Sequence, residues 1–566
     1  MRTIATREPM EGYRRRGNEK KFPDHFVEDF PDNRSGRWIR QSRGSTLGDL
    51  TAFVGGLMMP FAFAPFGFYG LTIVGLALFF RVLMRVTPAR SFWRGWVFGV
   101  AMFGTGVFWI HESFRFADVT LPLALLLTSA LIGVLALYPA LFGLFAALWS
   151  RRSAVMAQES PSSALAHTFF TALLILPAGW ILQEWVRGWF LSGFPWLQIG
   201  YAHTDSSLAG LAPLFGVYGV GWVASVSAGV LLLVFQLIMQ NESAIRKRVI
   251  RVLALLVLTG GLWGGSAWLD PEIGVSPVGA PIDVALIQGN IPQDRKWLPS
   301  QRQSTLDRYL SMTREQTGSH LVVWPETALP GFYYQFADFT ARLRWDTYTG
   351  GPDILLGVPT LDGESQRYFN SVAAISGAGE TFYHKRHLVP FGEYLPMSGI
   401  LQGMLDFLDI PMSDFSPGPP VQAPFRVAGQ IVAASVCYEA SFGNKIIASL
   451  PQATLLVNVS NEAWFGDSLG PHQNLQMARM RARESGRYLL RATNTGITAI
   501  IDPQGRVTGR APQFQVSALT GTVTGMRGTT PYARHGNRIV LSALLIVLLI
   551  GVFARSNHYR QMWQGP

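Results

Sequence analysis

Long apolar stretches separated by short polar loops fill the first half of the chain, and one more apolar stretch stands near its end. A helix that spans a membrane needs about 20 mostly apolar residues. On this criterion we predict eight spans: Leu47 to Pro65, Gly67 to Met84, Phe92 to Ile110, Leu121 to Trp149, Thr168 to Val186, Leu211 to Met239, Ile250 to Leu269 and Ile539 to Phe553. The pattern therefore indicates a polytopic α-helical membrane protein.

The pattern changes between the seventh and eighth spans, from Gly274 to about Gly536. Short β-branched apolar runs there alternate with turn residues and helical stretches, which is typical of an α/β domain. We expect strands at Ile282 to Gln288, Leu321 to Trp324, Ile354 to Val358, Ser371 to Ile375, Ile431 to Val436, Thr454 to Val459 and Gly496 to Asp502, and a helix at Asn474 to Gly486.

Composition agrees with a membrane protein and narrows the class further. The 566 residues are 49% hydrophobic and 15% charged, which excludes a disordered chain and a purely soluble enzyme. The net charge of +11 is compatible with nucleic-acid binding or with an arginine bias of membrane loops. One set of short loops holds ten positive residues: Arg81, Arg85, Arg90, Arg94, Arg151, Arg152, Arg246, Lys247, Arg248 and Arg251. The opposite loops hold two, Arg115 and Arg187.

This asymmetry predicts the orientation of the chain. Because positive loops stay in the cytoplasm, the domain 274–536 is expected on the extracytoplasmic side, and we expect no nucleic-acid partner. Residues 1–46 are rich in charge and lack the apolar core of a signal peptide. We interpret them as a disordered cytoplasmic tail, with binding of anionic lipid headgroups as an alternative. Span eight, 537–555, would return residues 556–566 to the cytoplasm.

Two candidate site residues lie near strand ends, where α/β domains tend to bind ligands. Glu326 directly follows an apolar run that Pro325 stops, and it is either a rigidly held carboxylate or an ordinary surface glutamate. Lys385 lies in a basic segment that is either a solvated loop or part of a site. Apolar neighbours argue against full exposure, and a carboxylate such as Glu393 would keep the lysine protonated.

The third candidate is Cys437, the only cysteine of the chain, at the end of the run Ile431 to Val436. A single cysteine excludes an intrachain disulfide and a multi-cysteine metal site. A buried cysteine is commonly just a small apolar residue. A lone thiol on the oxidising side of a membrane is a liability, however, so a nucleophile is the other interpretation.

Glutamate, lysine and cysteine in this order and setting resemble the nitrilase superfamily of carbon-nitrogen hydrolases. More narrowly, the chain from Leu47 to Arg555 resembles the apolipoprotein N-acyltransferases, a membrane-bound family. The motifs that carry the resemblance are Gly193-Phe-Pro-Trp, Gln288-Gly-Asn-Ile-Pro-Gln, Trp324-Pro-Glu-Thr-Ala, Lys385-Arg-His-Leu-Val-Pro-Phe-Gly-Glu-Tyr-Leu-Pro, Cys437-Tyr-Glu, Asn458-Val-Ser-Asn-Glu-Ala-Trp-Phe-Gly-Asp-Ser, Gly470-Pro-His-Gln and Gly528-Thr-Thr-Pro-Tyr-Ala-Arg. The tail 1–46 departs from the family, whose members generally begin close to the first span.

The resemblance implies an αββα sandwich in which Glu326 is the general base, Lys385 stabilises an oxyanion and Cys437 is the nucleophile. The implied reaction moves an acyl chain from a phospholipid, expected to be phosphatidylethanolamine, to the α-amino group of the diacylglyceryl-cysteine of lipoproteins through a thioester. The implied setting is the bacterial inner membrane, with the catalytic domain in the periplasm. We expect no cofactor and no metal.

Further residues are candidates for support or substrate contact. We expect Glu393 to orient Lys385, and Glu439 to fix the strand end or a substrate amine. Tyr438 could supply a backbone amide to the oxyanion. Three aromatic side chains could line the acyl path or act as interfacial anchors: Trp297, Trp464 and Phe465. His472 is expected to be structural. Ionisable groups at span ends could support the domain or contact headgroups: Glu184, Arg187, His111, Glu112 and Arg115.

The proton transfer from thiol to carboxylate sets a requirement on the site. With reference pKa values of ~8.5 for a thiol and ~4.3 for a carboxylate, proton transfer from Cys437 to Glu326 is uphill by about 6 kcal/mol. We expect the site to narrow that gap between the two pKa values.

Two other functions stay open. A membrane-tethered amidase could use the same triad with water as acceptor. A transporter with a soluble sensor is the alternative of another class, although matching broken helices are not evident in the sequence.

Overall fold

The computed structural model describes residues 34–84, 86–116, 119–156, 161–239, 245–269, 273–394 and 415–563. The chain divides into two compact units, Met1–Leu47 and Gly48–Pro566. The described part of the first unit is the start of helix α1 (Arg34–Met58). The second unit contains the remaining apolar helices and the α/β domain.

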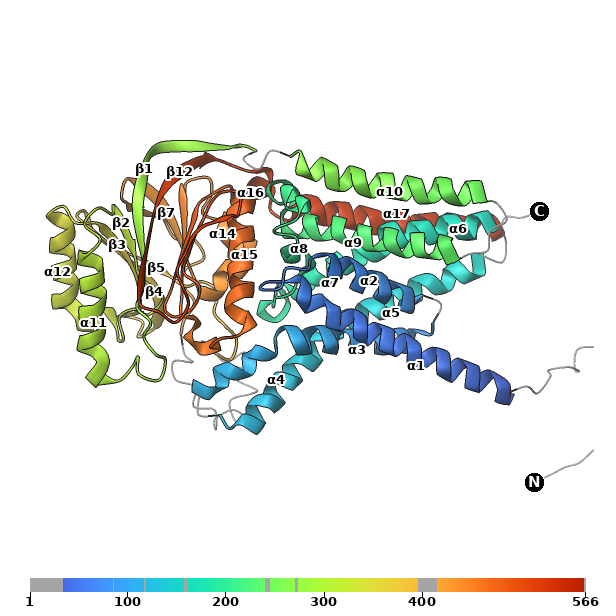
Figure 1. Ribbon diagram of the computed structural model, residues 1–566, viewed down its shortest axis with the longest axis horizontal. Coiled ribbons are helices and arrows are strands. Elements are labelled where there is room, and N and C mark those ends of the chain that lie inside the picture. Colours follow the sequence, from blue (N-terminus) through green and yellow to red (C-terminus); the bar gives the residue numbers. More distant parts are fainter. Residues whose placement is uncertain are drawn as a thin grey trace, which may run out of the picture. The chain divides into compact units, whose positions relative to one another are not determined.

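Apolar helices make up the N-terminal part of the second unit. They are α2 (Gly70–Leu83), α3 (Pro88–Gly106), η2 (Phe108–Phe116), α4 (Leu121–Leu135), α5 (Leu137–Met156), α6 (Pro161–Phe170), α7 (Leu176–Arg187), α8 (Ile199–Ala202), α9 (Ala212–Met239) and α10 (Ile245–Ala267). The last helix, α17 (Arg538–Trp563), follows the α/β domain and contacts α7 and α9. Figure 1 shows α17 running alongside α9.

Within the described residues, four helical segments are long and apolar enough to cross a membrane: Leu121–Ser150, Leu165–Arg187, Ser207–Met239 and Ile245–Ala267. The bent pair formed by α3 and η2 could add a fifth. Three shorter apolar helices are Thr46–Ala62, Gly70–Leu83 and Arg538–Phe553. Each of the eight expected spans corresponds to one of these segments, so the membrane character is confirmed, whereas the number eight stays a prediction.

The expected limits of the first and last spans differ from the observed helices. Helix α1 begins at Arg34 rather than at Leu47, so part of the expected disordered tail is helical. Helix α17 continues to Trp563, past the expected end at residue 555. Residues 1–33 and 564–566 lie outside the described residues. Local composition predicted these limits poorly, because polar residues such as Arg37, Arg40 and Arg43 can continue a helix beyond its apolar part.

The α/β domain contains two six-stranded sheets, one ordered β12-β1-β2-β3-β4-β5 and the other β11-β10-β9-β8-β7-β6. The strands of the first sheet are β1 (Val275–Gln288), β2 (Leu321–Val323), β3 (Asp353–Leu361), β4 (Tyr368–Ser376), β5 (Gly379–His384) and β12 (Ser517–Gly528). Those of the second are β6 (Phe425–Val427), β7 (Gln430–Val436), β8 (Leu455–Ser460), β9 (Leu489–Thr493), β10 (Ala499–Ile501) and β11 (Val507–Arg510). All seven expected strands are present, and β5, β6, β9, β11 and β12 were not predicted.

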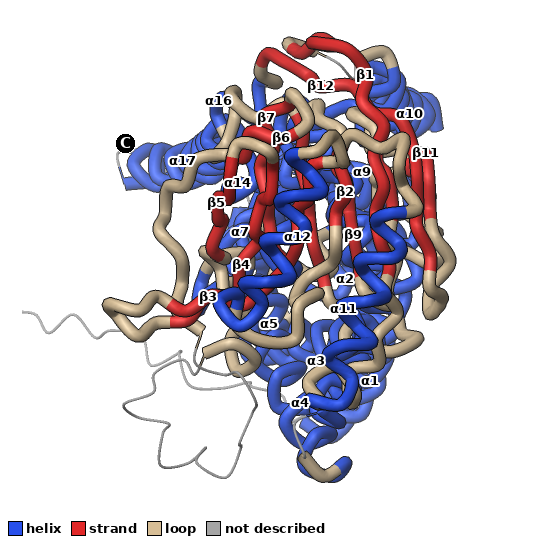
Figure 2. Tube along the Cα trace, turned by 90° about the vertical axis from the view of Figure 1, so that its left-hand side faces the viewer, coloured by secondary structure: helices blue, strands red, loops and turns tan. Residues whose placement is uncertain are grey.

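Helices cover the outer face of each sheet, which gives the expected αββα sandwich. Helices α11 (Pro299–Arg314) and α12 (Ala337–Tyr348) lie on the first sheet, in front of its strands in Figure 2. Helices α14 (Gly443–Ile447) and α15 (Leu469–Ser485) lie on the second. Alternation along one strand fills both interfaces: Val284 and Leu286 enter the core between the sheets, whereas Ala285 and Ile287 face α11.

Strand direction brings the candidate residues to one edge of the sandwich. Strands β1, β2 and β3 are parallel to one another, and so are β7, β8 and β9. Strand β5 also runs parallel to β3, because β4 is antiparallel to both. The residues after β2, β5 and β7, namely Glu326, Lys385 and Cys437, therefore leave the sheets at their carboxyl ends.

Helix α15 joins the sandwich to the apolar helices through two glutamine side chains. Gln473 Oε1 accepts hydrogen bonds from Trp109 Nε1 at 3.2 Å and from Trp196 Nε1 at 3.0 Å. Gln476 Oε1 accepts from the backbone N–H of Ala64 at 3.1 Å. The helix that covers the second sheet is thus also the part that docks on the membrane domain.

A carboxylate of α15 completes the same contact at a break in α9. Gly216 has φ +65° and interrupts that helix, which leaves the N–H of Val217 without a helical acceptor. Glu484 Oε1 accepts from this N–H at 2.7 Å and pairs with Arg481 Nη2 at 3.0 Å, and both ionic side chains are buried.

We expect Glu484→Ala to destabilise the docked protein. The change leaves the Arg481 guanidinium as an unpaired buried charge and removes the acceptor of Val217 N–H, a loss of about 3 to 5 kcal/mol. The measurement is the thermal unfolding midpoint of the protein in detergent. Glu364→Ala, at an exposed position, is the matched control. Equal midpoints for the two variants would contradict the role of this contact.

Candidate active site

Glu326 lies on a sharp turn that the neighbouring strand permits. Thr327 has φ +48°, in the left-handed region, so the chain reverses directly after the glutamate. Strand β3 passes so close that a Cβ at Gly357 would lie 2.5 Å from Glu326 Cα. Gly357 O accepts from Ala328 N at 2.8 Å and holds the turn against the sheet. The backbone contacts therefore fix the position of Glu326 Cα.

Two amide groups fix the position of the Glu326 carboxylate oxygens. Asn370 Nδ2, from β4, donates to Oε1 at 2.7 Å, and the backbone N–H of Asn461, after β8, donates to Oε2 at 2.7 Å. The carboxylate is almost completely buried. Both donors come from elements far from Glu326 in sequence, so the completed fold orients this side chain.

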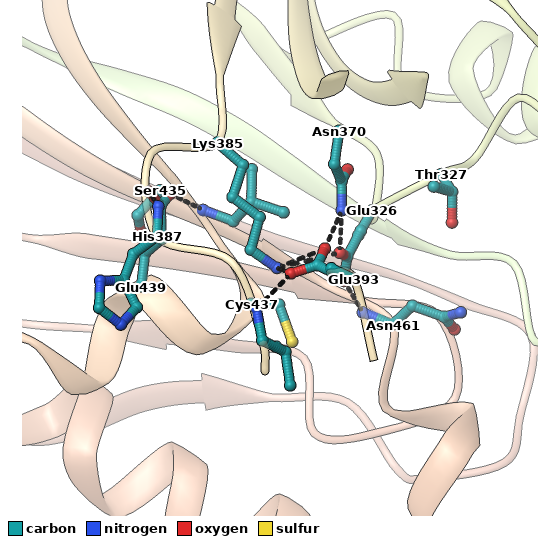
Figure 3. A network of polar contacts seen from close by, with 12 residues as sticks. Glu326, Thr327, Asn370, Lys385, His387, Glu393, Ser435, Cys437, Glu439 and Asn461 are labelled. Atoms are coloured by element: carbon teal, nitrogen blue, oxygen red, sulfur yellow. Dashed lines mark hydrogen bonds and ion pairs between the residues drawn. The ribbon is translucent and has the colours of Figure 1, made fainter. Parts of the chain in front are cut away.

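Lys385 lies between two carboxylates (Figure 3). Its Nζ is 2.8 Å from Glu393 Oε2 and 3.9 Å from Glu326 Oε1. Burial alone would lower the pKa of Lys385, but the charges of Glu393 and Glu326 outweigh burial and raise it. Asn370 Nδ2 also donates to Glu393 at 3.0 Å, and Val389 N donates to its other oxygen at 2.8 Å. Glu393 thus contacts Lys385 directly, as expected for a residue that orients it.

Cys437 is the first residue after β7 and begins the short helix η7 (Cys437–Ser441). Its φ is +49°, so the thiol is held on a strained turn, and the residue is only partly buried. In Figure 3 its sulfur lies beside Glu326, Glu393 and the tip of Lys385. The structure therefore brings the three sequence-predicted residues into one cluster.

The surroundings of the Cys437 sulfur favour the protonated thiol. Burial, together with the negative charge of Glu326, raises the pKa of Cys437 to about 12, and the nearby Lys385 only partly opposes this rise. We expected the site to narrow the gap between thiol and carboxylate. For the thiol the structure shows the opposite, because desolvation of the sulfur and the charge of Glu326 outweigh the charge of Lys385.

Glu439 fixes the strand end rather than lying free for a substrate amine. Its carboxylate accepts from Val436 N at 2.8 Å, on the strand that delivers the thiol. It also accepts from the backbone N–H of Arg386 at 2.7 Å and of His387 at 3.1 Å, directly after Lys385. One carboxylate thereby links the segment that carries the lysine to the turn that carries the cysteine.

A buried ion pair supports the loop after β8. Arg491, on β9, pairs with Glu462 and hydrogen-bonds Asn458 Oδ1. Asn458 Nδ2 donates to Ser435 Oγ at 3.1 Å on β7. These contacts hold the loop whose Asn461 N–H reaches Glu326. This loop belongs to the motif from Asn458 to Ser468, for which the sequence pattern suggested a role only of the aromatic residues.

Three of the aromatic candidates, Tyr438, Trp464 and Phe465, contact the membrane domain. Tyr438 Oη donates to Gly193 O at 2.7 Å, and its ring stacks on Trp196. Phe465 packs edge-on against Trp109, and Trp464 packs edge-on against Phe116. Trp297 is 38% exposed and directly follows the segment 293–296. Side-chain contacts are thus known for Tyr438, whereas a role of its backbone amide stays a prediction.

The ionisable groups at the span ends divide into two sets. Glu184 accepts from Ile199 N at 3.1 Å, and Arg187 donates to Phe194 O at 2.7 Å, so both hold the loop that contains Gly193. In the second set, His111 and Glu112 line a cavity of about 450 Å³ near η2, and His472 of α15 lines the same cavity. Arg115 pairs with Glu112 there at 2.8 Å.

Sequence reasoning missed three polar residues that contact Glu326: Asn370, Asn461 and Lys296. Lys296 Nζ lies 3.2 Å from Glu326 O. Asn461 lies inside the motif from Asn458 to Ser468, but no local sequence pattern marks Asn370 or Lys296 as site residues. Over the described residues, no group of three or more His, Cys, Asp or Glu side chains is arranged to hold a metal ion.

Two family models match the chain. The carbon-nitrogen hydrolase model matches residues 283–532, and the apolipoprotein N-acyltransferase N-terminal domain model matches residues 55–230. The chain is 43% identical over 520 residues to the apolipoprotein N-acyltransferase of Methylococcus capsulatus, covering 91% of this chain and 98% of that protein. The chain belongs to the apolipoprotein N-acyltransferase family.

Other members of the family are similar over nearly the whole chain. The apolipoprotein N-acyltransferase of Azotobacter vinelandii is 40% identical over 91% of this chain and 96% of its own length. That of Nitrosomonas europaea is 39% identical over 89% and 97%. The carbon-nitrogen hydrolase match contains Glu326, Lys385 and Cys437. The N-terminal match contains Trp109 and Trp196, which hydrogen-bond Gln473 of α15. The family therefore accounts for both parts of the chain.

We expect Cys437 to react slowly with iodoacetamide near neutral pH. Because the thiolate is the reactive form, labelling should rise about tenfold for each pH unit and reach no plateau below pH 10. Lys385→Met should label more slowly, since it removes the charge that favours the thiolate. Mass spectrometry of the single cysteine gives the rates, and the unfolded protein, with an ordinary thiol pKa of ~8.5, is the control. A plateau near pH 8.5 in the folded protein would contradict a raised pKa of the Cys437 thiol.

Proposed function

We propose that this protein transfers an acyl chain from a phospholipid to the α-amino group of the diacylglyceryl-cysteine of lipoproteins. In this proposal Cys437 is the nucleophile, Glu326 the general base and Lys385 the cation that stabilises the oxyanion. The observation that carries it is the meeting of these three side chains at the edge of a sandwich that docks on apolar helices. Family membership over 91% of the chain supports the same activity.

The first half-reaction forms a thioester. As the sulfur attacks the ester carbonyl, the thiol proton passes to Glu326 and the C–S bond forms. The negative charge moves to the carbonyl oxygen, beside Lys385. A thiol with a pKa of about 12 does not ionise first, so proton transfer accompanies attack. Collapse breaks the ester C–O bond, and Glu326 returns the proton to the departing lysophospholipid.

The second half-reaction consumes the thioester. The α-amino group of the lipoprotein attacks the thioester carbonyl, and Glu326 accepts one amine proton. Collapse of this intermediate breaks the C–S bond, forms the amide and returns the proton to the sulfur. An α-amino group has a reference pKa of ~7.7 to 8.0, so a useful fraction is neutral near pH 7.

Contacts with the apolar helices favour a lipid substrate over a small amide. His387 Nε2 donates to Ser192 O at 2.9 Å, and Tyr438 reaches Gly193, so residues beside Lys385 and Cys437 contact the membrane domain. A cavity of about 380 Å³ at this contact is lined in part by Trp185 and Trp189. A site next to a bilayer would keep water scarce near the thioester and favour transfer over hydrolysis.

We further propose the bacterial inner membrane as the location, with eight spans and residues 274–536 in the periplasm. Residues 1–46 and 556–566 would then be cytoplasmic. The support is the ten-to-two distribution of positive loop residues described above. Phosphatidylethanolamine is the proposed donor, on the resemblance alone. Trp297, Trp464 and Phe465 are proposed to line the acyl path, supported by the packing of the last two on η2.

We expect wild-type protein incubated with phospholipid to gain the mass of one acyl chain, on Cys437. Hydroxylamine at neutral pH should release that chain, because thioesters are labile to it. Cys437→Ser should carry no hydroxylamine-labile chain. Intact mass spectrometry measures both, and addition of a diacylglyceryl peptide should clear the adduct from the wild type. Adducts of equal size and lability on both proteins would remove Cys437 from the mechanism.

We expect a reporter that is active only outside the cytoplasm to be active when fused after Trp297. The same reporter fused after Arg152 should be inactive, since that position follows a positive loop segment. Reporter activity in intact cells, normalised to fusion abundance, makes the measurement. Activity after Arg152 together with silence after Trp297 would reverse the proposed orientation.

A further inference from the structure

Lys296 is a second buried lysine beside Glu326, and the chemistry described above does not use it. It is 2% exposed and lies in the segment after β1. Its Nζ donates to Glu326 O at 3.2 Å and to Thr327 Oγ1 at 2.7 Å. Both acceptors are uncharged, which is unusual for a buried ammonium group because desolvating a charge is costly.

The two hydrogen bonds of Lys296 hold the turn that presents the Glu326 carboxylate. They bind the carbonyl of Glu326 and the side chain of Thr327, the residues on either side of one peptide bond. Thr327 is β-branched and has φ +48°, a combination that persists only where surrounding contacts impose it. Without Lys296, this turn would lose two hydrogen bonds, one at the side chain of Thr327 and one at the carbonyl of Glu326.

The segment of Lys296 also reaches the other end of Glu326. Gln293 Oε1 accepts from Asn461 Nδ2 at 2.8 Å, and the backbone N–H of Asn461 donates to Glu326 Oε2. Residues 293–296 therefore contact the base through its backbone and, by way of Asn461, through its carboxylate. Trp297 follows directly, so the same segment connects the base to a half-exposed aromatic side chain.

Electrostatic interaction gives Lys296 a second effect on the same carboxylate. Two carboxylates, Glu326 and Glu393, lie here with two amino groups, Lys385 and Lys296. Lys385 Nζ lies 2.8 Å from Glu393 and 3.9 Å from Glu326, and Lys296 is a second amino group that interacts electrostatically with Glu326. Burial lowers the pKa of Lys296 to about 7, and the charge of Glu326 opposes this shift. Buried groups so perturbed are concentrated at functional sites.

We propose that Lys296 is a positioning residue for the general base, which holds the Glu326–Thr327 turn so that the carboxylate meets first the thiol proton and then the amine proton. The inference rests on the proposed function, since it assigns Lys296 a part in the acyl transfer proposed there. Lys296 acts through Glu326 and does not itself touch the reacting atoms.

The test is single-turnover formation of the acyl-enzyme by Lys296→Met, which removes the charge and the donors at similar length. At saturating phosphatidylethanolamine we expect a rate constant about 10- to 100-fold below wild type, because small displacements of a catalytic group have effects of this size. The half-saturating phospholipid concentration should stay unchanged, since no substrate contact is lost. Lys247→Met, at an exposed position of α10, is the matched control and should react at the wild-type rate.

A second pair of variants tests the hydrogen bond itself. Thr327→Val keeps the shape and β-branch of threonine but removes the acceptor, whereas Thr327→Ser keeps the acceptor. We expect Thr327→Val to slow acylation and Thr327→Ser to retain most of the rate. The double variant with Lys296→Met and Thr327→Val should be little slower than Lys296→Met alone. Both changes remove the same hydrogen bond, the one from Lys296 Nζ to Thr327 Oγ1.

The outcomes separate positioning from folding and from the proposed function. Impaired folding would reduce the fraction of protein that forms an adduct while the remainder reacts at the wild-type rate constant, and this result would overturn the proposal. Acylation by Lys296→Met as fast as wild type would overturn it too. If the wild type itself forms no adduct on Cys437, the proposed function fails, and that outcome is distinct from both.

Discussion

The ion pair between Lys385 and Glu393 is the interaction on which the rest of the site depends. It places an ammonium group 3.9 Å from Glu326 inside the protein, where two charges are stable only if geometry and further hydrogen bonds offset their lost hydration. Asn370 bonds both carboxylates at once, and Val389 N–H completes the shell of Glu393. The surrounding strand ends therefore satisfy the buried charges, and the thiol of Cys437 lies beside them.

Much of this arrangement could be predicted from sequence, because the deciding signals are local. An apolar run followed by Pro325 and Glu326 marks a strand end, and a single cysteine after another run marks a second. Strands β5, β9 and β12 were not predictable in this way. Strand β9 contains Arg491, whose charge is neutralised by Glu462 from a distant loop, so its own residues conceal that it is buried. Burial of this kind is a property of the assembled fold and leaves no local pattern.

The same distinction explains the partners of Glu326 that were missed. Asn370 and Lys296 lie 44 and 30 residues from the glutamate and reach it only after β4 and the segment behind β1 are in place. The number of spans poses the opposite problem: hydropathy identifies apolar segments readily, but in three of the eight the apolar helical part is 17 residues or shorter. Composition thus predicts what is apolar more securely than it predicts what crosses the bilayer.

The hydrogen bond from Tyr438 to Gly193 links the residue after Cys437 to a loop that follows helix α7. That loop is also held by Arg187, at the end of the helix. Tilting of α7 to match a thinner or thicker lipid layer would consequently pull on the strained turn at Cys437. Bilayer thickness would then act on the geometry of this turn, because spanning helices tilt to match the hydrophobic thickness around them.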